Sequence, residues 1–207
     1  MTDVEERLPV VLLSDRADRW RELVPGLEAR FRPVVAETSG AIGGLGLDRY
    51  AVVAEGEAAT AVLGLALGGD PVDAMVLLTP IDDGSLAGRD PELAALSCPV
   101  LIFTGEDDPV VPVAAVEALG DRIPSSTLGV LPGCGHDLVE EAPETLFPMI
   151  VEYLRARYAH APHGHEDHSG LVMLQLERRP PWADVEAPDD DEPTVPDPTT
   201  QEVGPGA

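Results

Sequence analysis

The chain has 207 residues and a formal net charge of −25, because it contains 38 acidic residues, 13 arginines and no lysine. A field of this sign repels phosphate backbones and anionic lipid surfaces, which argues against nucleic acid and membranes as partners. Hydrophobic residues make up 44% of the chain, enough to build a buried core.

The sequence shows no sign of export or of a metal framework. Residues 1–9 lack the basic and apolar regions of a signal peptide, and no apolar run approaches the roughly 20 residues of a membrane helix. Cys98 and Cys134 provide neither a disulfide framework nor a paired metal motif. We therefore expect a soluble cytoplasmic protein without a cofactor or a bound metal.

Short apolar runs alternate with segments of helical periodicity. The runs predict buried strands at residues 8–13, 33–36, 50–54, 74–78, 99–103 and 127–131. Helices are predicted at residues 20–31, 57–67 and 112–119 and from residue 143 onward, and residues 39–49 form a glycine-rich connection. Strands that alternate with helices, each a near-continuous apolar run, indicate a parallel sheet covered on both faces.

Two motifs late in the chain resemble those of α/β-hydrolases. CPVLIFTGEDDPVVP, from residue 98, is similar to the strand and turn that deliver the catalytic acid, and LPGCGHDLVEEAPETL, from residue 131, to the strand and loop that deliver the histidine. The resemblance assigns the acid to Asp108 and the histidine to His136, with Asp108 orienting the imidazole. We also consider a purely structural hydrogen bond between them.

The family's nucleophile elbow, Gly-x-Ser-x-Gly, matches residues 54–58, Ala-Glu-Gly-Glu-Ala. Gly56 stands in the serine's place, so the elbow has no hydroxyl to attack a carbonyl. Glu55 and Glu57 flank it; either could act as a carboxylate nucleophile, but we expect Glu57 to favour the helix terminus and Glu55 to face a loop or solvent. Ser14 and Asp15 occupy the usual oxyanion His-Gly position, where a negative charge opposes catalysis.

The resemblance implies a minimal α/β-hydrolase-like three-layer sandwich over residues 1–158, with about six mostly parallel strands, helices on both faces and no lid domain. Residues 159–207 form an acidic, proline-rich tail that we expect to be largely disordered. Within residues 177–207 there are nine acidic residues and seven prolines.

The tail contains an apolar segment at residues 169–185 that predicts either an added edge strand or a peptide that binds a partner protein. The candidate contact residues are Leu171, Met173, Leu174, Leu176, Arg178, Arg179 and Trp182. Four histidines between residues 160 and 168 could bind a metal, although such clusters in acidic segments are more often incidental.

Two functions remain open at this point. The leading interpretation is a non-catalytic α/β-hydrolase-like protein that binds a partner protein or a small ligand, because Gly56 removes the nucleophile. The alternative is an esterase-like hydrolase, or a general-base enzyme, that uses His136 and Asp108 without a serine.

Overall fold

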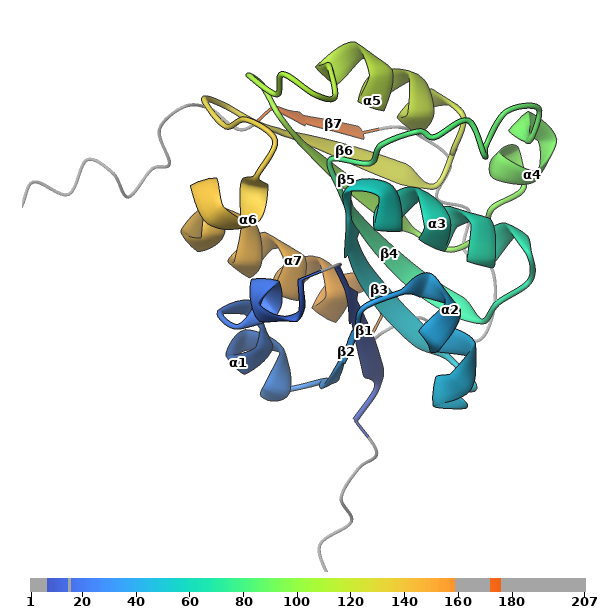
Figure 1. Ribbon diagram of the computed structural model, residues 1–207, viewed down its shortest axis with the longest axis vertical. Helices are drawn as coiled ribbons and strands as arrows, with labels where there is room; N and C mark the ends of the chain where they lie inside the picture. Colours follow the sequence, from blue (N-terminus) through green and yellow to red (C-terminus); the bar gives the residue numbers. More distant parts are fainter. Residues whose placement is uncertain (1–6, 15, 159–171, 176–207) are drawn as a thin grey trace, which may run out of the picture.

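The computed structural model describes residues 7–14, 16–158 and 172–175. In this part of the chain, seven strands form one sheet in the order β2-β1-β3-β4-β5-β6-β7 (Figure 1). Every neighbouring pair is parallel. The strands are β1 (Pro9–Leu13), β2 (Arg32–Ala36), β3 (Tyr50–Glu55), β4 (Val72–Leu78), β5 (Val100–Gly105), β6 (Ser126–Leu131) and β7 (Val172–Gln175).

Helices cover both faces of the sheet, so the described part of the chain has three layers (Figure 1). One face carries η1 (Ala17–Trp20), α1 (Leu23–Glu28), α6 (Leu138–Glu141) and α7 (Pro143–Arg157). The other carries α2 (Ser39–Ile42), α3 (Gly56–Leu67), α4 (Asp90–Ala94) and α5 (Val113–Asp121), with η2 (Gly43–Leu45) following α2. No helix among the described residues has the length and apolar character needed to cross a membrane.

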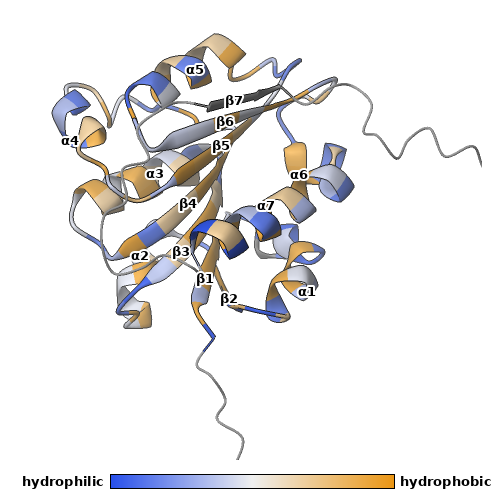
Figure 2. Ribbon diagram, turned by 180° about the vertical axis from the view of Figure 1, so that it is seen from behind, coloured by the Kyte–Doolittle hydropathy of each residue, from blue (hydrophilic) through white to orange (hydrophobic). Residues whose placement is uncertain are grey.

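Burial on both sides explains why the strands are apolar at nearly every position. In β1, Val10 and Leu12 pack beneath α1 and α7, whereas Val11 and Leu13 pack toward α2 and α3. The middle strands are accordingly coloured as mostly hydrophobic in Figure 2. The predicted parallel sheet with helices on both faces is therefore confirmed.

Several short elements differ from the prediction. The predicted helix at residues 20–31 is instead η1 followed by α1, with Pro25 in the first turn of α1, where no intrahelical N–H is needed. The connection at residues 39–49 contains α2 and η2. The short helices α4 and α6 were not predicted, because four or five residues are too few to display a helical period.

The seventh strand comes from the apolar tail segment. Residues 172–175 pair in parallel with residues 127–130 of β6, so for these four residues the structure has the added edge strand. Of the candidate contact residues, Met173 and Leu174 lie in β7, and the remainder of the set lies outside the described residues. A partner protein at this segment stays a prediction.

Candidate active site

The polar residues of interest gather at one edge of the sheet, because parallel strands end on the same side. There a pocket of about 580 Å³ lies over the ends of β1, β3 and β4. It is also where the chain order reverses, since β2 and β3 lie on opposite sides of β1, and ligands of open α/β sheets bind at such a point. The lining residues are Arg16, Arg19, Glu37, Thr38, Ser39, Glu55, Gly56, Glu57, Ala58, Ala61, Thr79, Ile81 and His136.

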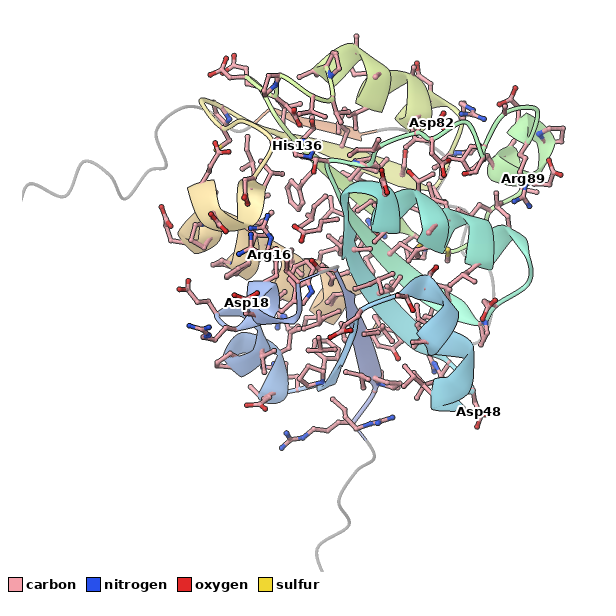
Figure 3. All side chains as sticks on the ribbon, in the orientation of Figure 1. Arg16, Asp18, Asp48, Asp82, Arg89 and His136 are labelled. Carbon is pink, nitrogen blue, oxygen red and sulfur yellow. The ribbon has the colours of Figure 1, made fainter. Side chains whose placement is uncertain are left out.

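Asp108 and His136 form the predicted pair. Nδ1 of His136 lies 2.8 Å from Oδ2 of Asp108. Oδ1 of Asp108 accepts hydrogen bonds from the backbone N–H groups of Val110 and Val111, at 2.7 and 2.9 Å. The Asp108 side chain is fully buried, whereas the imidazole is one-third exposed and lines the pocket. Figure 3 shows His136 between α3 and α6.

The surroundings of Asp108 keep it ionised. Burial acts to raise its pKa, but the hydrogen bonds from Val111, His136 and Val110 together outweigh burial and hold the pKa below its ordinary value. An ionised carboxylate accepts a hydrogen bond from the N–H group at Nδ1 of His136. The other ring nitrogen, Nε2, is then left as a proton acceptor, and it has no hydrogen-bond partner among the described residues.

The close approach of two backbones brings this pair together. A Cβ at Gly105, the last residue of β5, would lie only 2.1 Å from the carbonyl oxygen of Gly135 and 2.3 Å from that of Cys134. These are the residues directly before His136, and the N–H of Asp107 donates to the Cys134 carbonyl at 2.9 Å. The glycine of Gly-x-x-Asp is therefore required so that the acid and histidine loops can pack against each other.

Gly56 lies at the sharp turn between β3 and α3, as the sequence predicts. Its φ is +58°, a left-handed conformation that glycine adopts without strain. A Cβ built there meets only the Ile81 side chain, at 3.8 Å, so the position has room for a serine. Glu57 follows in the first turn of α3, exposed and without a side-chain hydrogen bond that caps the helix.

Glu55 does not face solvent, contrary to the prediction. Its side chain is 16% exposed and accepts hydrogen bonds from Nε of Arg19 at 3.0 and 3.1 Å. It also accepts one from the buried Ser14 hydroxyl at 2.5 Å. Ser14 thus joins the ends of β1 and β3, and Glu55 is engaged as an ion-pair partner. Asp15, the other predicted oxyanion-position residue, lies outside the described residues.

Sequence reasoning missed Arg19, whose buried guanidinium joins three elements. Besides Glu55, it binds Asp137, the residue directly after His136, and Glu140, at 2.8 Å. Burial acts to lower the Arg19 pKa, but the hydrogen bonds to Asp137 and Glu55 and their charges raise it above its ordinary value. Nothing local in the sequence marks this residue, because its partners lie 36 to 121 positions away.

Thr79, at the end of β4, is a second residue that the sequence reasoning missed. It is 3% exposed, lines the pocket, and adopts a φ of +41°. Among the described residues no group of three or more histidines, cysteines or carboxylates is placed to hold a metal ion. The four histidines of the tail lie outside the described residues.

Solved structures of hydrolases share the fold of this chain. A CIB-like hydrolase from Thermoplasma acidophilum superposes with a TM-score of 0.64 at 18% identity, covering 75% of this chain and 89% of that one. The meta-cleavage product hydrolase of Pseudomonas fluorescens superposes with a TM-score of 0.62 at 18% identity, covering 75% of this chain and 93% of that one. The carboxylesterase CesB of Bacillus subtilis superposes with a TM-score of 0.62 at 14% identity, covering 73% of this chain and 85% of that one. At these identities the similarity establishes the fold, which is α/β-hydrolase-like, as predicted.

No family model matches the sequence. One curated relative, a Caulobacter sp. protein that carries the name carbamate hydrolase RutD, is 33% identical over 70 residues. The match spans 34% of this chain and only 26% of that relative. The chain therefore spans about a quarter of the length of this relative.

Proposed function

We propose that the protein is a hydrolase of small ester-like substrates in which His136, oriented by Asp108, activates a water molecule directly. The observation that carries the proposal is the 2.8 Å contact between Nδ1 of His136 and Asp108, with the imidazole at the wall of a 580 Å³ pocket. A pair that served only as a structural link would not require the imidazole to line a pocket.

The reaction needs no covalent intermediate. Nε2 of His136 accepts a proton from water while the water oxygen forms a bond to the substrate carbonyl carbon, and the carbonyl π electrons move onto its oxygen. The tetrahedral intermediate then expels the leaving group, which takes the proton from Nε2. Asp108 stays ionised throughout and stabilises the transient imidazolium. General-base help of this kind accelerates a reaction by about 10²- to 10⁴-fold, which predicts a slow enzyme.

The site supports the developing negative charge at the start of α3. Gly56, Glu57 and Ala58 line the pocket, and no side chain caps this helix terminus. The first N–H groups of an α-helix have no intrahelical acceptor, and they favour negative charge. A carbonyl oxygen held there would receive hydrogen bonds as its charge grows.

A panel of p-nitrophenyl esters and a p-nitrophenyl carbamate tests the proposal on the full chain. The wild type is expected to hydrolyse at least one substrate above background, and His136→Ala is expected to lose that activity while remaining folded, since the His136 side chain is partly exposed. Equal rates for wild type and His136→Ala across the panel would contradict the proposal.

The second candidate is a binding protein without catalysis, and Gly56 is the observation that favours it. With no hydroxyl at the elbow and Glu55 held by Arg19, the pocket would then retain a small ligand and leave it unchanged. Under this alternative the panel shows no turnover, but a substrate analogue raises the melting temperature of the wild type.

A further inference from the structure

Thr79 holds a backbone conformation that β-branched residues avoid. It directly follows β4, and its φ of +41° is the one positive value at a non-glycine residue in the described part of the chain. Its N–H donates to the Phe103 carbonyl at 2.7 Å, which fixes the backbone between β4 and β5. Strain of this kind persists where the surrounding structure enforces it, and it concentrates at functional sites.

The Thr79 hydroxyl has no hydrogen-bond partner among the described residues, although the residue is 3% exposed and lines the pocket. Unlike Oγ1 of Thr104, which is buried without a partner, Oγ1 of Thr79 is not cut off from solvent, so a water or a ligand group in the pocket can hydrogen-bond to it. Thr60 provides the contrast, because its equally buried hydroxyl donates to the Ile81 carbonyl at 2.6 Å.

Strand register places Thr79 beside the missing nucleophile. Glu55 of β3 pairs with Leu78 of β4, so the next residues, Gly56 and Thr79, lie side by side at the sheet edge. His136 lines the same pocket, yet it makes no direct hydrogen bond with Thr79. Two polar groups that face one cavity without touching are commonly bridged by water.

We propose that Oγ1 of Thr79 and Nε2 of His136 together hold the water that attacks the substrate. This inference rests on the proposed function. The water donates one hydrogen to Nε2 and the other to Oγ1, which leaves an oxygen lone pair directed at the carbonyl carbon. Thr79 keeps its own proton and forms no covalent bond, so the balance of the reaction is unchanged.

Thr79→Val and Thr79→Ser form the matched pair that tests this role. Valine keeps the β-branch and the volume and removes only the hydroxyl, whereas serine keeps the hydroxyl. We expect Thr79→Val to lower kcat for p-nitrophenyl acetate by roughly tenfold, the usual effect of one hydrogen bond to the reacting group, with KM and melting temperature near wild type. Thr79→Ser should stay within about threefold of wild type.

Three other outcomes would overturn the inference, and each assigns a different role to Thr79 or to the site. A Thr79→Val variant with wild-type kcat, or one altered only in KM, removes Thr79 from water binding while leaving His136 as the base. A phosphonofluoridate adduct on Thr79, detected by mass spectrometry, would make it a nucleophile instead. If wild type and His136→Ala react equally, the proposed function fails first, and the role of Thr79 fails with it.

Discussion

At the scale of single residues, one side chain at position 56 separates this site from one with a nucleophile. Gly56→Ser places a hydroxyl at the elbow, where the nearest side-chain atom to a new Cβ is 3.8 Å away. The left-handed backbone should cost about 1–2 kcal/mol of unfolding free energy, because a Cβ strains it. We expect faster release of p-nitrophenol, with an initial burst from an acyl-enzyme.

Gly56→Ala is the matched control for that prediction, because it carries the same backbone cost without a hydroxyl. Stopped-flow absorbance and thermal melts on both variants separate the two effects. A burst in neither variant would show that the pair of Asp108 and His136 is not aligned on this position.

Asp108 predicts a pH dependence of stability. Its pKa is lower in the folded chain than in the unfolded chain, so its contribution is complete above the unfolded value of about 3.9 and is lost as the pH falls through the folded value. Urea unfolding from pH 7 to pH 3 should therefore show Asp108→Asn destabilised at neutral pH, with a difference that shrinks below about pH 4. Both proteins keep His136, because its hydrogen bond is one of the contacts that lower the pKa of Asp108.

At the scale of elements, Gly105 fixes the packing of the acid loop against the histidine loop. Gly105→Ala would place a methyl group 2.1 Å from a backbone carbonyl oxygen, and backbone cannot yield as a side chain can. We expect a loss of about 3 kcal/mol in unfolding free energy, together with loss of hydrolysis, because the histidine loop must move.

Gly64→Ala is the control for Gly105→Ala. Gly64 lies within α3 with open space around a Cβ, so alanine there should be neutral or stabilising by about 0.5–1 kcal/mol. Equal stability of the two variants would contradict the close approach of the loops.

Arg19 also acts at the scale of elements, because its side chain joins η1, the end of β3 and the start of α6. Arg19→Met leaves the carboxylate of Glu55 with little solvent and no cation, and we expect about 2–4 kcal/mol of destabilisation in urea unfolding. Arg155→Met, which breaks the exposed pair with Glu152, should cost much less stability, because solvent screens that pair. If both variants lose the same stability, the ion pairs of Arg19 are not what holds these elements together.

At the scale of the whole molecule, the net charge of −25 predicts self-repulsion that salt screens. Raising sodium chloride from 10 to 200 mM should stabilise the chain by about 1 kcal/mol, or roughly 2–4 °C in melting temperature, with most of the change below physiological ionic strength. Scanning calorimetry checks this, and a melting temperature that falls with salt would contradict it. Sulfate is avoided because it stabilises proteins by exclusion from their surface.

The sequence by itself determined the layers, the strands and the place of the acid, the histidine and Gly56. These features are local: a buried strand needs a continuous apolar run, and each motif sits where its own strand ends. The short helices η1, α2, α4 and α6 were not predicted, because each has too few residues to establish a period.

Only the tertiary structure decided what surrounds those motifs. Arg19 meets Asp137 across 118 positions, and Thr79 lines the same pocket as Gly56 and His136. Neither arrangement can be seen in the local sequence. The stability that an ion pair contributes, and the cost of burying a hydroxyl, depend on burial, which only the packing of distant segments creates. The same packing turned Glu55, expected to face a loop or solvent, into the partner of a buried guanidinium.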